Sequence, residues 1–345
     1  MGIGAASTAP ADTRKTALAD FCAAALGLAA VALEPASADA SFRRYFRLRL
    51  AEGATLIAMD SPPAREALAS FLAVARAFGG CGLHVPRVVA ADETHGFALV
   101  EDLGSETYLA RLRSGADPAP LYGAAIEALV RLQCLHDAGL PVYDGEQLTA
   151  ETALFSDWLL ERHLALKLGA TERALVERSG ERLSALALAQ PRVAVHRDYH
   201  SRNLMIAAPL PGILDFQDAV LGPVSYDLVS LLKDCYIAWP RERILAWLRR
   251  YRELAEASDI PVGRDEAEFL RWFETMGMQR HLKAAGIFAR LYHRDGKPDY
   301  LADIPRTLRY VVEAAEKLPE FADLGAFIAA RVLPALTEAK RRCGR

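Results

Sequence analysis

The first hundred residues show the two-residue alternation of apolar and polar side chains that is typical of β-strands. Within residues 42–60 the apolar positions fall on one face, except that Arg44 stands among them. A second short strand at 55–59, a helix at about 64–78 after Pro62-Pro63, and further strands at 87–90 and 97–100 follow. We predict a small, mostly antiparallel sheet with one helix.

After residue 105 the pattern changes to the periodicity of helices. We predict helices at about 118–138, 151–168, 171–189, 240–257, 265–284 and 300–317. Only residues 192–215 interrupt them, with short β-like runs at 193–195 and 212–214. The polar, Gly-terminated segment Glu101–Gly104 marks the change, so we predict two domains, residues 1–103 and 104–345.

The N-terminal segment is open to two interpretations. Arg14 and Lys15 precede an apolar stretch from Ala17 to Leu33, and small residues follow it, which is the order of an export signal. Asp20 interrupts the apolar stretch, however. We therefore favour an amphipathic helix that packs on the domain.

Composition excludes several classes of protein. Among the 345 residues, Lys+Arg 41 against Asp+Glu 44 gives a net charge of -3, whereas general nucleic-acid binders are strongly basic. No apolar run reaches the roughly 20 residues of a transmembrane helix. The chain has 5 cysteines, an odd number, and they are widely spaced without a CxxC pair. This pattern predicts reduced thiols in a cytoplasmic protein.

The strongest chemical signal lies in the segment that interrupts the helices. His196-Arg-Asp198 is followed by Asn203 and then by Asp215-Phe-Gln217. This spacing is typical of phosphoryl transfer, in which a carboxylate orients a hydroxyl nucleophile and accepts its proton, a role for Asp198. Mg²⁺ prefers hard oxygen ligands, which Asn203 and Asp215 offer. A chance match of all three parts, each beside a short apolar strand, is the weaker interpretation.

These motifs resemble the aminoglycoside-phosphotransferase-like kinases of small molecules. A protein kinase is less similar, because no Ala-Pro-Glu follows the Asp-Phe-Gln segment. Over about residues 12–330 the chain is most similar to the anomeric sugar kinases of bacterial cell-wall recycling. The segments that carry this resemblance are 39–47, 59–63, 101–104, 196–203, 215–218, 226–236 and 279–283.

The resemblance implies an α+β, bilobal, protein-kinase-like fold, with a small antiparallel-sheet N-lobe covering ATP and a mostly helical C-lobe holding the substrate pocket. It implies an ATP- and Mg²⁺-dependent kinase of N-acetylmuramate and N-acetylglucosamine that acts at the C1 hydroxyl. We further expect a cytoplasmic monomer with no nucleic-acid or membrane partner, whose product passes to a nucleotidyltransferase. The segment 12–38 would then belong to the fold.

The resemblance also suggests roles for other residues. Backbone groups of Glu101 and Leu103 would contact adenine, and Ser41 would lie over the phosphates. Supporting roles fall to His196 and Asp227, which would brace the catalytic loop. The expected substrate contacts are His200, Asp218, Arg280 and Lys283. A structural role is equally open for His200, and for either cation alone a solvated basic face is the better expectation.

One departure from kinase-like folds concerns the cation that neutralises phosphate. Those folds carry a lysine on the third strand, but here Met59-Asp60 ends that strand and Lys15 is the only lysine before the hinge. Arginines 43, 44 and 47 are candidates. We favour Arg44, because an arginine on an apolar strand face needs a reason; a surface arginine at a sheet edge is the alternative.

Two alternative functions stay open. A cationic acceptor, such as an aminoglycoside or an amino alcohol, would need an acidic pocket, for which Asp218, Asp227 and Asp234 are candidates. The absent third-strand lysine would also fit a non-catalytic nucleotide-binding module. Against that module, Asp198, Asn203 and Asp215 are all present.

Overall fold

The computed structural model describes residues 12–37, 43–64, 68–136 and 139–343. They form two compact units. The smaller unit contains the residues up to Ala75 together with Pro86–Leu103, and the larger contains Arg76–Val85 and the residues from Gly104 onward. The segment 76–85, at the end of the helix predicted in the first domain, thus belongs with the larger unit.

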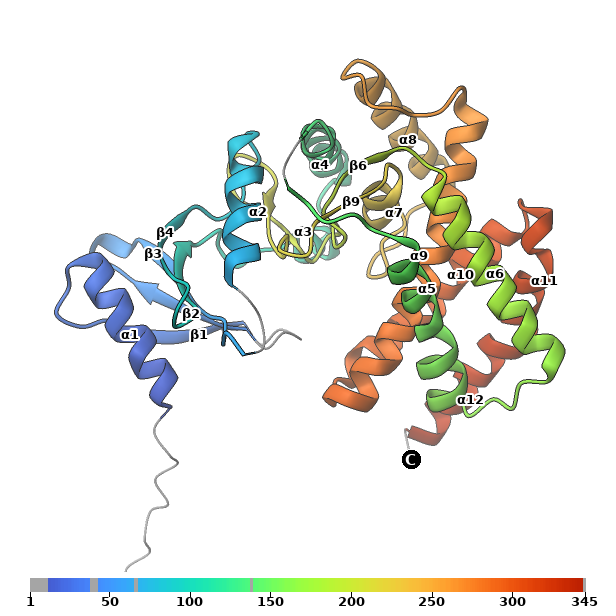
Figure 1. Ribbon diagram of the computed structural model, residues 1–345, viewed down its shortest axis with the longest axis horizontal. Coiled ribbons are helices and arrows are strands. Elements are labelled where there is room, and N and C mark those ends of the chain that lie inside the picture. The colour runs from blue at the N-terminus through green and yellow to red at the C-terminus, as the bar shows by residue number, and fades with distance from the viewer. Residues whose placement is uncertain (1–11, 38–42, 65–67, 137–138, 344–345) are drawn as a thin grey trace, which may run out of the picture. The chain divides into compact units, whose positions relative to one another are not determined.

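The smaller unit is built on an antiparallel sheet, whose strands β1 to β4 are labelled in Figure 1. The sheet has five strands in the order β1-β2-β3-β5-β4. The strands are β1 (Leu33–Ser37), β2 (Arg44–Arg49), β3 (Thr55–Asp60), β4 (Val88–Asp92) and β5 (Phe97–Glu101). Four of them match the predicted strands. The strand β1 was missed, because Leu33–Ser37 contains a proline and lacks a clear alternation.

Helix α1 (Thr13–Leu26) packs against this sheet. Leu18 and Cys22 of the helix share one buried cluster with Phe46, Leu48 and Leu99 of the sheet. Asp12 caps the helix by accepting the N–H of Lys15, and Gly27 ends it with the positive φ that glycine adopts at little cost. The amphipathic-helix interpretation of this segment is confirmed.

The larger unit is mostly helical. Its helices are α3 (Tyr108–Arg113), α4 (Pro118–Gln133), α5 (Gly145–Leu154), α6 (Ala170–Leu188), α7 (Tyr226–Leu232), α8 (Arg241–Glu256), α9 (Glu266–Asp295), α10 (Ile304–Ala315), α11 (Ala322–Phe327) and α12 (Leu333–Cys343). A π-helical turn, Phe155–His163, continues α5, and further short turns connect the C-terminal helices. Helix α2 (Leu68–Gly80) contributes its last residues to this unit.

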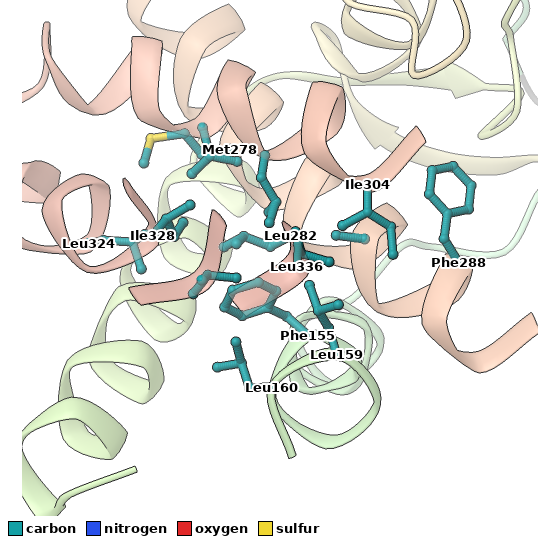
Figure 2. Packing of buried hydrophobic residues seen from close by; sticks show 14 of the residues in the cluster. Phe155, Leu159, Leu160, Met278, Leu282, Phe288, Ile304, Leu324, Ile328 and Leu336 are labelled. Atoms are coloured by element: carbon teal, nitrogen blue, oxygen red, sulfur yellow. The ribbon is translucent and has the colours of Figure 1, made fainter. Parts of the chain in front are cut away.

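Helix α9 is the central helix of the larger unit and packs against α5, α6, α7 and α10. Figure 2 shows part of the apolar cluster around it, in which Leu282 and Phe288 of α9 meet Phe155 and Leu159 of the π-helical turn. At Gly286 a Cβ atom would lie 2.3 Å from the carbonyl carbon of Leu154. The two segments can approach this closely only because residue 286 has no side chain.

The predicted helices are found, with changes at their ends. The helix expected at 265–284 continues to Asp295, and the one expected at 118–138 ends at Gln133. The short helices α3, α7 and α11 were not predicted, because one or two turns carry too little periodicity to recognise. Helix α12 was not predicted either. Within the described residues no helix is long and apolar enough to cross a membrane.

Two short ladders hold the segment that interrupts the helices. β6 (Arg192–Val195) pairs with β9 (Val220–Pro223), and β7 (Leu204–Met205) pairs with β8 (Gly212–Ile213). The motif His196–Asn203 therefore lies between two strands, and Asp215 follows a third. These ladders fix both ends of the loop that carries the predicted chemistry.

Candidate active site

The loop after β6 is held by a buried carboxylate at the start of α7. Asp227 accepts the backbone N–H groups of His196, at 2.6 Å, and Arg197, at 3.0 Å. Burial raises the pKa of Asp227 to about 7, while these two donors act in the opposite direction. Arg197 has a φ of 78°, a left-handed conformation that a side-chain-bearing residue adopts only when its surroundings enforce it.

His196 links this loop to the Asp215 segment. Its Nε2 lies 3.0 Å from the carbonyl oxygen of Leu214, and its Nδ1 lies 3.2 Å from the backbone N–H of Asp198. Burial lowers the pKa of His196 to about 4, so the ring is neutral at pH 7. A neutral ring that donates from Nε2 and accepts at Nδ1 satisfies both contacts.

Asn203 joins the Asp198 and Asp215 segments. Its Nδ2 donates to the backbone oxygen of Asp198 at 3.0 Å and lies 3.4 Å from Oδ2 of Asp215. Gln217 donates from its amide to Oδ1 of Asp215 at 2.8 Å, which orients that carboxylate. Asp215 has a φ of 63°, so strain is concentrated at this residue as well. The structure thus brings together the three residues on which the kinase hypothesis depends.

The donor set fits a magnesium ion held together with a nucleotide. With its amide nitrogen turned to Asp198 and Asp215, Asn203 keeps its amide oxygen for a cation, and Asp215 adds a carboxylate. Mg²⁺ takes one or two protein oxygens and completes its shell with water and phosphate. Within the described residues there is no cluster of three or more His, Cys, Asp or Glu that could hold a metal by itself.

The carboxylate of Asp198 is kept ionised by its surroundings. Burial alone would raise its pKa, but positive charge at His200, Lys283 and Arg280 outweighs burial and lowers it. Burial lowers the pKa of His200, so its ring is neutral at pH 7. At that pH the charges of Lys283 and Arg280 are therefore the ones that lower the pKa of Asp198. Among the described residues no hydrogen-bond donor occupies the Asp198 carboxylate oxygens, which leaves them available to a substrate hydroxyl.

Lys283 does not lie on a solvated basic face. It is buried, its Nζ lies 2.8 Å from Glu151, and it donates to the Tyr226 hydroxyl at 3.0 Å. Arg197 contacts the same Glu151 carboxylate at 2.5 Å, and the hydroxyl of Tyr143 donates to it. Glu151 therefore ties the loop to α9. Sequence reasoning missed Glu151, since one glutamate in a predicted helix carries no signal of its partners.

Asp234 is a second brace that was not predicted. It is fully buried and accepts from the backbone N–H of Ser201 at 2.9 Å, from the Ser201 hydroxyl at 2.5 Å and from the N–H of Tyr236 at 2.8 Å. Asp227 and Asp234 thus fix the loop on either side of Asp198. Both carboxylates are used inside the protein and do not form an acidic pocket.

Arg280 and His200 are placed near Asp198 but differently from Lys283. Arg280 is 6% exposed, and its contact within the described residues is a weak one, with Sγ of Cys235 at 3.8 Å. Its Nε has no partner, and neither has the buried Nδ1 of His200, whose ring packs edge-on against Tyr236. The expectation of a solvated basic face is wrong for Arg280 as well. Asp218, by contrast, is exposed, and no hydrogen bond or ion pair in the described part of the chain joins it to this cluster.

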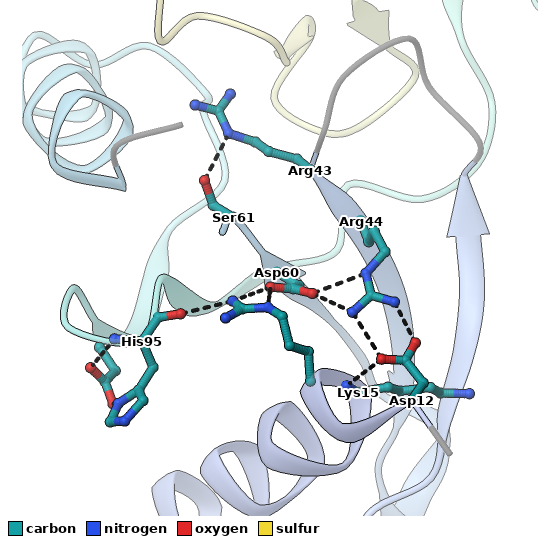
Figure 3. Close-up of polar contacts among 9 residues, drawn as sticks. Asp12, Lys15, Arg43, Arg44, Asp60, Ser61 and His95 are labelled. Carbon is teal, nitrogen blue, oxygen red and sulfur yellow. Dashed lines mark hydrogen bonds and ion pairs between the residues drawn. The ribbon is translucent and has the colours of Figure 1, made fainter. Parts of the chain in front are cut away.

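In the smaller unit Arg44 lies on the apolar face, as its position in β2 predicted, but carboxylates engage it there (Figure 3). Its guanidinium contacts buried Asp60 at 2.9 and 2.5 Å and also pairs with Asp12. Arg14 holds the other oxygen of Asp60. These ion pairs explain an arginine on this face and remove the reason for assigning it to phosphate.

The two other candidate arginines differ from Arg44 by one and three positions, so in the two-residue alternation of the strand they fall on the other face. Arg43 is buried and its Nε lies 3.4 Å from the hydroxyl of Ser61, while Arg47 pairs with Asp102 at 2.5 Å. The backbone N–H of Glu101 donates to the carbonyl of Arg87 at 2.9 Å, so it closes a β-type contact. Leu103 is buried. Ser41 lies outside the described residues.

Comparisons with known proteins agree with this geometry. Residues 32–270 match the model of the phosphotransferase enzyme family. The N-acetylmuramate/N-acetylglucosamine kinase of Pseudomonas aeruginosa is 48% identical to this chain, covering 86% of the chain and 88% of that protein. A kinase of the same name from Neisseria meningitidis is 45% identical, covering 85% and 88%.

Solved structures show the same fold at low identity. A choline/ethanolamine kinase family protein from Mesorhizobium loti aligns with a TM-score of 0.59 and 18% identity, covering 88% of this chain and 92% of that one. An ADP-bound aminoglycoside phosphotransferase aligns with a TM-score of 0.55 and 14% identity, covering 86% and 98%. The predicted α+β kinase-like fold is confirmed, and the chain belongs to the phosphotransferase enzyme family.

Proposed function

We propose that this protein is an ATP-dependent kinase that phosphorylates N-acetylmuramate and N-acetylglucosamine at the C1 hydroxyl. The observation that carries the proposal is the joining of Asp198, Asn203 and Asp215 through the Asn203 amide, at 3.0 and 3.4 Å. The names of the relatives that are 45–48% identical supply the acceptor. Together they combine a phosphoryl-transfer constellation with an amino-sugar substrate.

The transfer needs a proton acceptor beside the sugar hydroxyl. The Asp198 carboxylate accepts the proton of the C1 hydroxyl while the sugar oxygen bonds to the γ-phosphorus and the bond to the ADP oxygen breaks. An anomeric hydroxyl is more acidic than an ordinary alcohol, so a carboxylate of lowered pKa is an adequate base. The products are the sugar 1-phosphate and ADP, and the proton passes from Asp198 to water.

The remaining residues position the reactants. Bound Mg²⁺, held by Asn203 and Asp215 with the phosphates, would neutralise the charge that develops on the transferred group. Gln217 keeps the Asp215 carboxylate oriented, and Asp227 and Asp234 keep the loop in place. In this scheme backbone groups of Glu101 and Leu103 would contact adenine, and the larger unit would hold the acceptor. Positioning and charge neutralisation then supply most of the rate acceleration.

The setting of the reaction follows from the same proposal. ATP as phosphoryl donor and reduced cysteines suit a cytoplasmic enzyme, and four cysteines of the described chain, Cys22, Cys81, Cys134 and Cys235, are free thiols. A sugar 1-phosphate is the type of substrate that a nucleotidyltransferase activates. We therefore place the protein before such a step and expect it to act as a monomer.

A cationic acceptor is less well supported. The acidic pocket that it would need was expected from Asp218, Asp227 and Asp234. Two of these carboxylates accept hydrogen bonds from the loop, and the third is exposed. No acidic pocket is assembled by these three residues, so we prefer the neutral or anionic amino sugar.

The test is ³¹P NMR of the purified chain with MgATP and each amino sugar. A new resonance split by the anomeric proton identifies the sugar 1-phosphate. The matched control is Asp198→Asn, checked by circular dichroism, which should give no such signal on the same time scale. Absence of turnover with both sugars would overturn the proposal, and a product phosphorylated at another hydroxyl would overturn the position of transfer.

A further inference from the structure

Arg280 differs from the other buried cations of the larger unit. Lys233 contacts Glu274 at 2.5 Å, and Lys283 contacts Glu151 at 2.8 Å. The Arg280 side chain is as deeply buried, 6% exposed, yet within the described residues no carboxylate lies within ion-pair distance of it. Its Nε–H has no acceptor, and a thiol at 3.8 Å is the partner of one Nη.

An arrangement of this kind is costly for a folded protein. A guanidinium taken out of water needs an anion or several hydrogen-bond acceptors to replace the lost hydration. A thiol is a weak acceptor and does not meet that need. The charges of Asp198 and Asp234 act on Arg280 from beyond ion-pair distance. Among the described residues no anion contacts its donors, and a ligand that supplies one best explains the arrangement.

The surroundings place this cation next to the proposed base. The charges of Arg280 and Lys283 both act on Asp198 and lower its pKa, and Arg280 also acts on the ring of His200. His200 is two residues from Asp198 and has a buried Nδ1 without a partner. An unpaired cation and an unpaired ring nitrogen thus lie beside the residue that is to meet the sugar hydroxyl.

We propose that Arg280 binds the carboxylate of the lactyl group of N-acetylmuramate and so distinguishes this sugar from N-acetylglucosamine, which carries no carboxylate. This inference rests on the proposed function. The planar guanidinium offers Nε–H and Nη–H donors in the geometry that a carboxylate accepts. His200 contributes a further polar contact to the same sugar. Arg280 is thereby a specificity-determining residue, whereas Lys283, held by Glu151, is a positioning residue.

The other anion available to Arg280 is a phosphate of ATP. Both sources share the same chemistry, but they predict different kinetics. A phosphate contact would serve every acceptor equally, because all of them use the same nucleotide. A lactyl contact would serve N-acetylmuramate alone. Comparing the two sugars with one variant therefore separates the sources.

The experiment measures kcat/KM of wild type and Arg280→Met for both sugars under saturating MgATP. We expect a roughly ten- to hundredfold loss for N-acetylmuramate, which is the usual effect of losing a hydrogen-bonded charge pair. The value for N-acetylglucosamine should fall less, because that sugar loses only the effect of the Arg280 charge on Asp198, so the ratio of the two sugars should shift by roughly tenfold. Arg280→Lys, which keeps the charge but loses the planar fork, should recover part of the N-acetylmuramate activity.

Arg294→Met is the matched control, because Arg294 lies on the same helix as Arg280 but already has a carboxylate partner. Its Nε contacts Asp295 at 2.8 Å. It should leave the ratio of the two sugars unchanged. Urea unfolding adds a readout of structure and shows whether Arg280→Met folds as cooperatively as wild type.

An equal loss for both sugars, with a raised KM for ATP, would assign Arg280 to phosphate and overturn the inference. An unchanged ratio with full activity would overturn it too. Wild-type protein that phosphorylates neither sugar would instead overturn the proposed function, so the two failures are distinguishable.

Discussion

Two arginines, one in each unit, were candidates from the sequence for contact with a ligand, and their surroundings differ. Arg44 on β2 contacts Asp60 at 2.5 Å and also pairs with Asp12 (Figure 3). Arg280 on α9 is buried, and in the described part of the chain it has a cysteine sulfur at 3.8 Å as its contact. Two carboxylates contact the partly exposed arginine, whereas in the described part of the chain none contacts the buried arginine, on which Asp198 and Asp234 act from further away.

The difference separates structural charges from binding charges. A paired arginine has its electrostatic requirement met inside the protein and serves to join α1, β2 and β3. An unpaired buried arginine raises the free energy of the empty protein and lowers it only when an anion arrives. Removing each group in turn should therefore change stability in one region and substrate preference in the other.

The largest effect should come from the carboxylate that shares its surroundings with Arg280. Asp198→Asn removes the proton acceptor, and kcat should fall at least about 10²-fold, as for loss of a general base. Initial rates of ADP release with saturating sugar and MgATP measure this. Retention of near-normal turnover would show that the base is another residue.

His196 shows a third way to bury a titratable group, which is to keep it neutral. Its folded pKa of about 4 lies below the ordinary 6.5, so on acidification the unfolded chain binds a proton that the folded chain does not. The free energy of unfolding should therefore fall by about 2 kcal/mol between pH 7 and pH 5 from this group. Urea unfolding of wild type and His196→Gln at both pH values isolates it.

The comparison of wild type with His196→Gln is needed because Asp227 changes the free energy of unfolding with pH in the opposite direction. Its raised folded pKa, about 7, contributes stability at low pH that is lost as the pH rises from about 4 towards 7. Since Asp227 is present in both proteins, the difference in pH dependence between them belongs to His196. Equal pH dependence in wild type and variant would contradict a neutral, buried His196.

Removing the carboxylate that pairs with Arg44 should lower the free energy of unfolding. Asp60→Asn leaves Arg14 and Arg44 without the fully buried carboxylate that joins them, and we expect a loss of about 2 kcal/mol in the free energy of unfolding. Urea unfolding measures it. Asp299→Asn provides a control, because that aspartate is exposed and lies in the first turn of the short helix Pro298–Asp303 of the larger unit. A loss no greater than the control's would show that these ion pairs are not structural.

The smallest effect should come from Arg44 itself. Arg44→Met should lower stability by about 1 kcal/mol and leave the KM for ATP unchanged, because the guanidinium is already used by two carboxylates. Arg43→Met is the variant to compare with Arg44→Met, because Arg43 is more buried than Arg44 and directly precedes it in the chain. A raised KM for ATP in Arg44→Met alone would restore the sequence-based assignment.

Much of the fold and part of the site could be predicted because their signals are local. Alternation along β2 and β3 and helical periodicity in α4, α6, α8 and α9 follow from which face of an element meets the core. The spacing of Asp198, Asn203 and Asp215 is also local, because one loop and the strands beside it carry all three. Resemblance to a family of known chemistry added the acceptor.

The sequence by itself determined most of the longer elements, the phosphoryl-transfer motif and the family. Tertiary structure alone decided which charges are satisfied. Glu151 meets Arg197 46 residues away, Asp60 meets Arg14 at the same separation, and Asp234 meets Ser201 across 33 residues. Such pairs leave no periodic trace, since an ion pair depends on where two distant segments are brought by packing of the core. For the same reason only the fold could show that Arg44 is paired and that Arg280 is not.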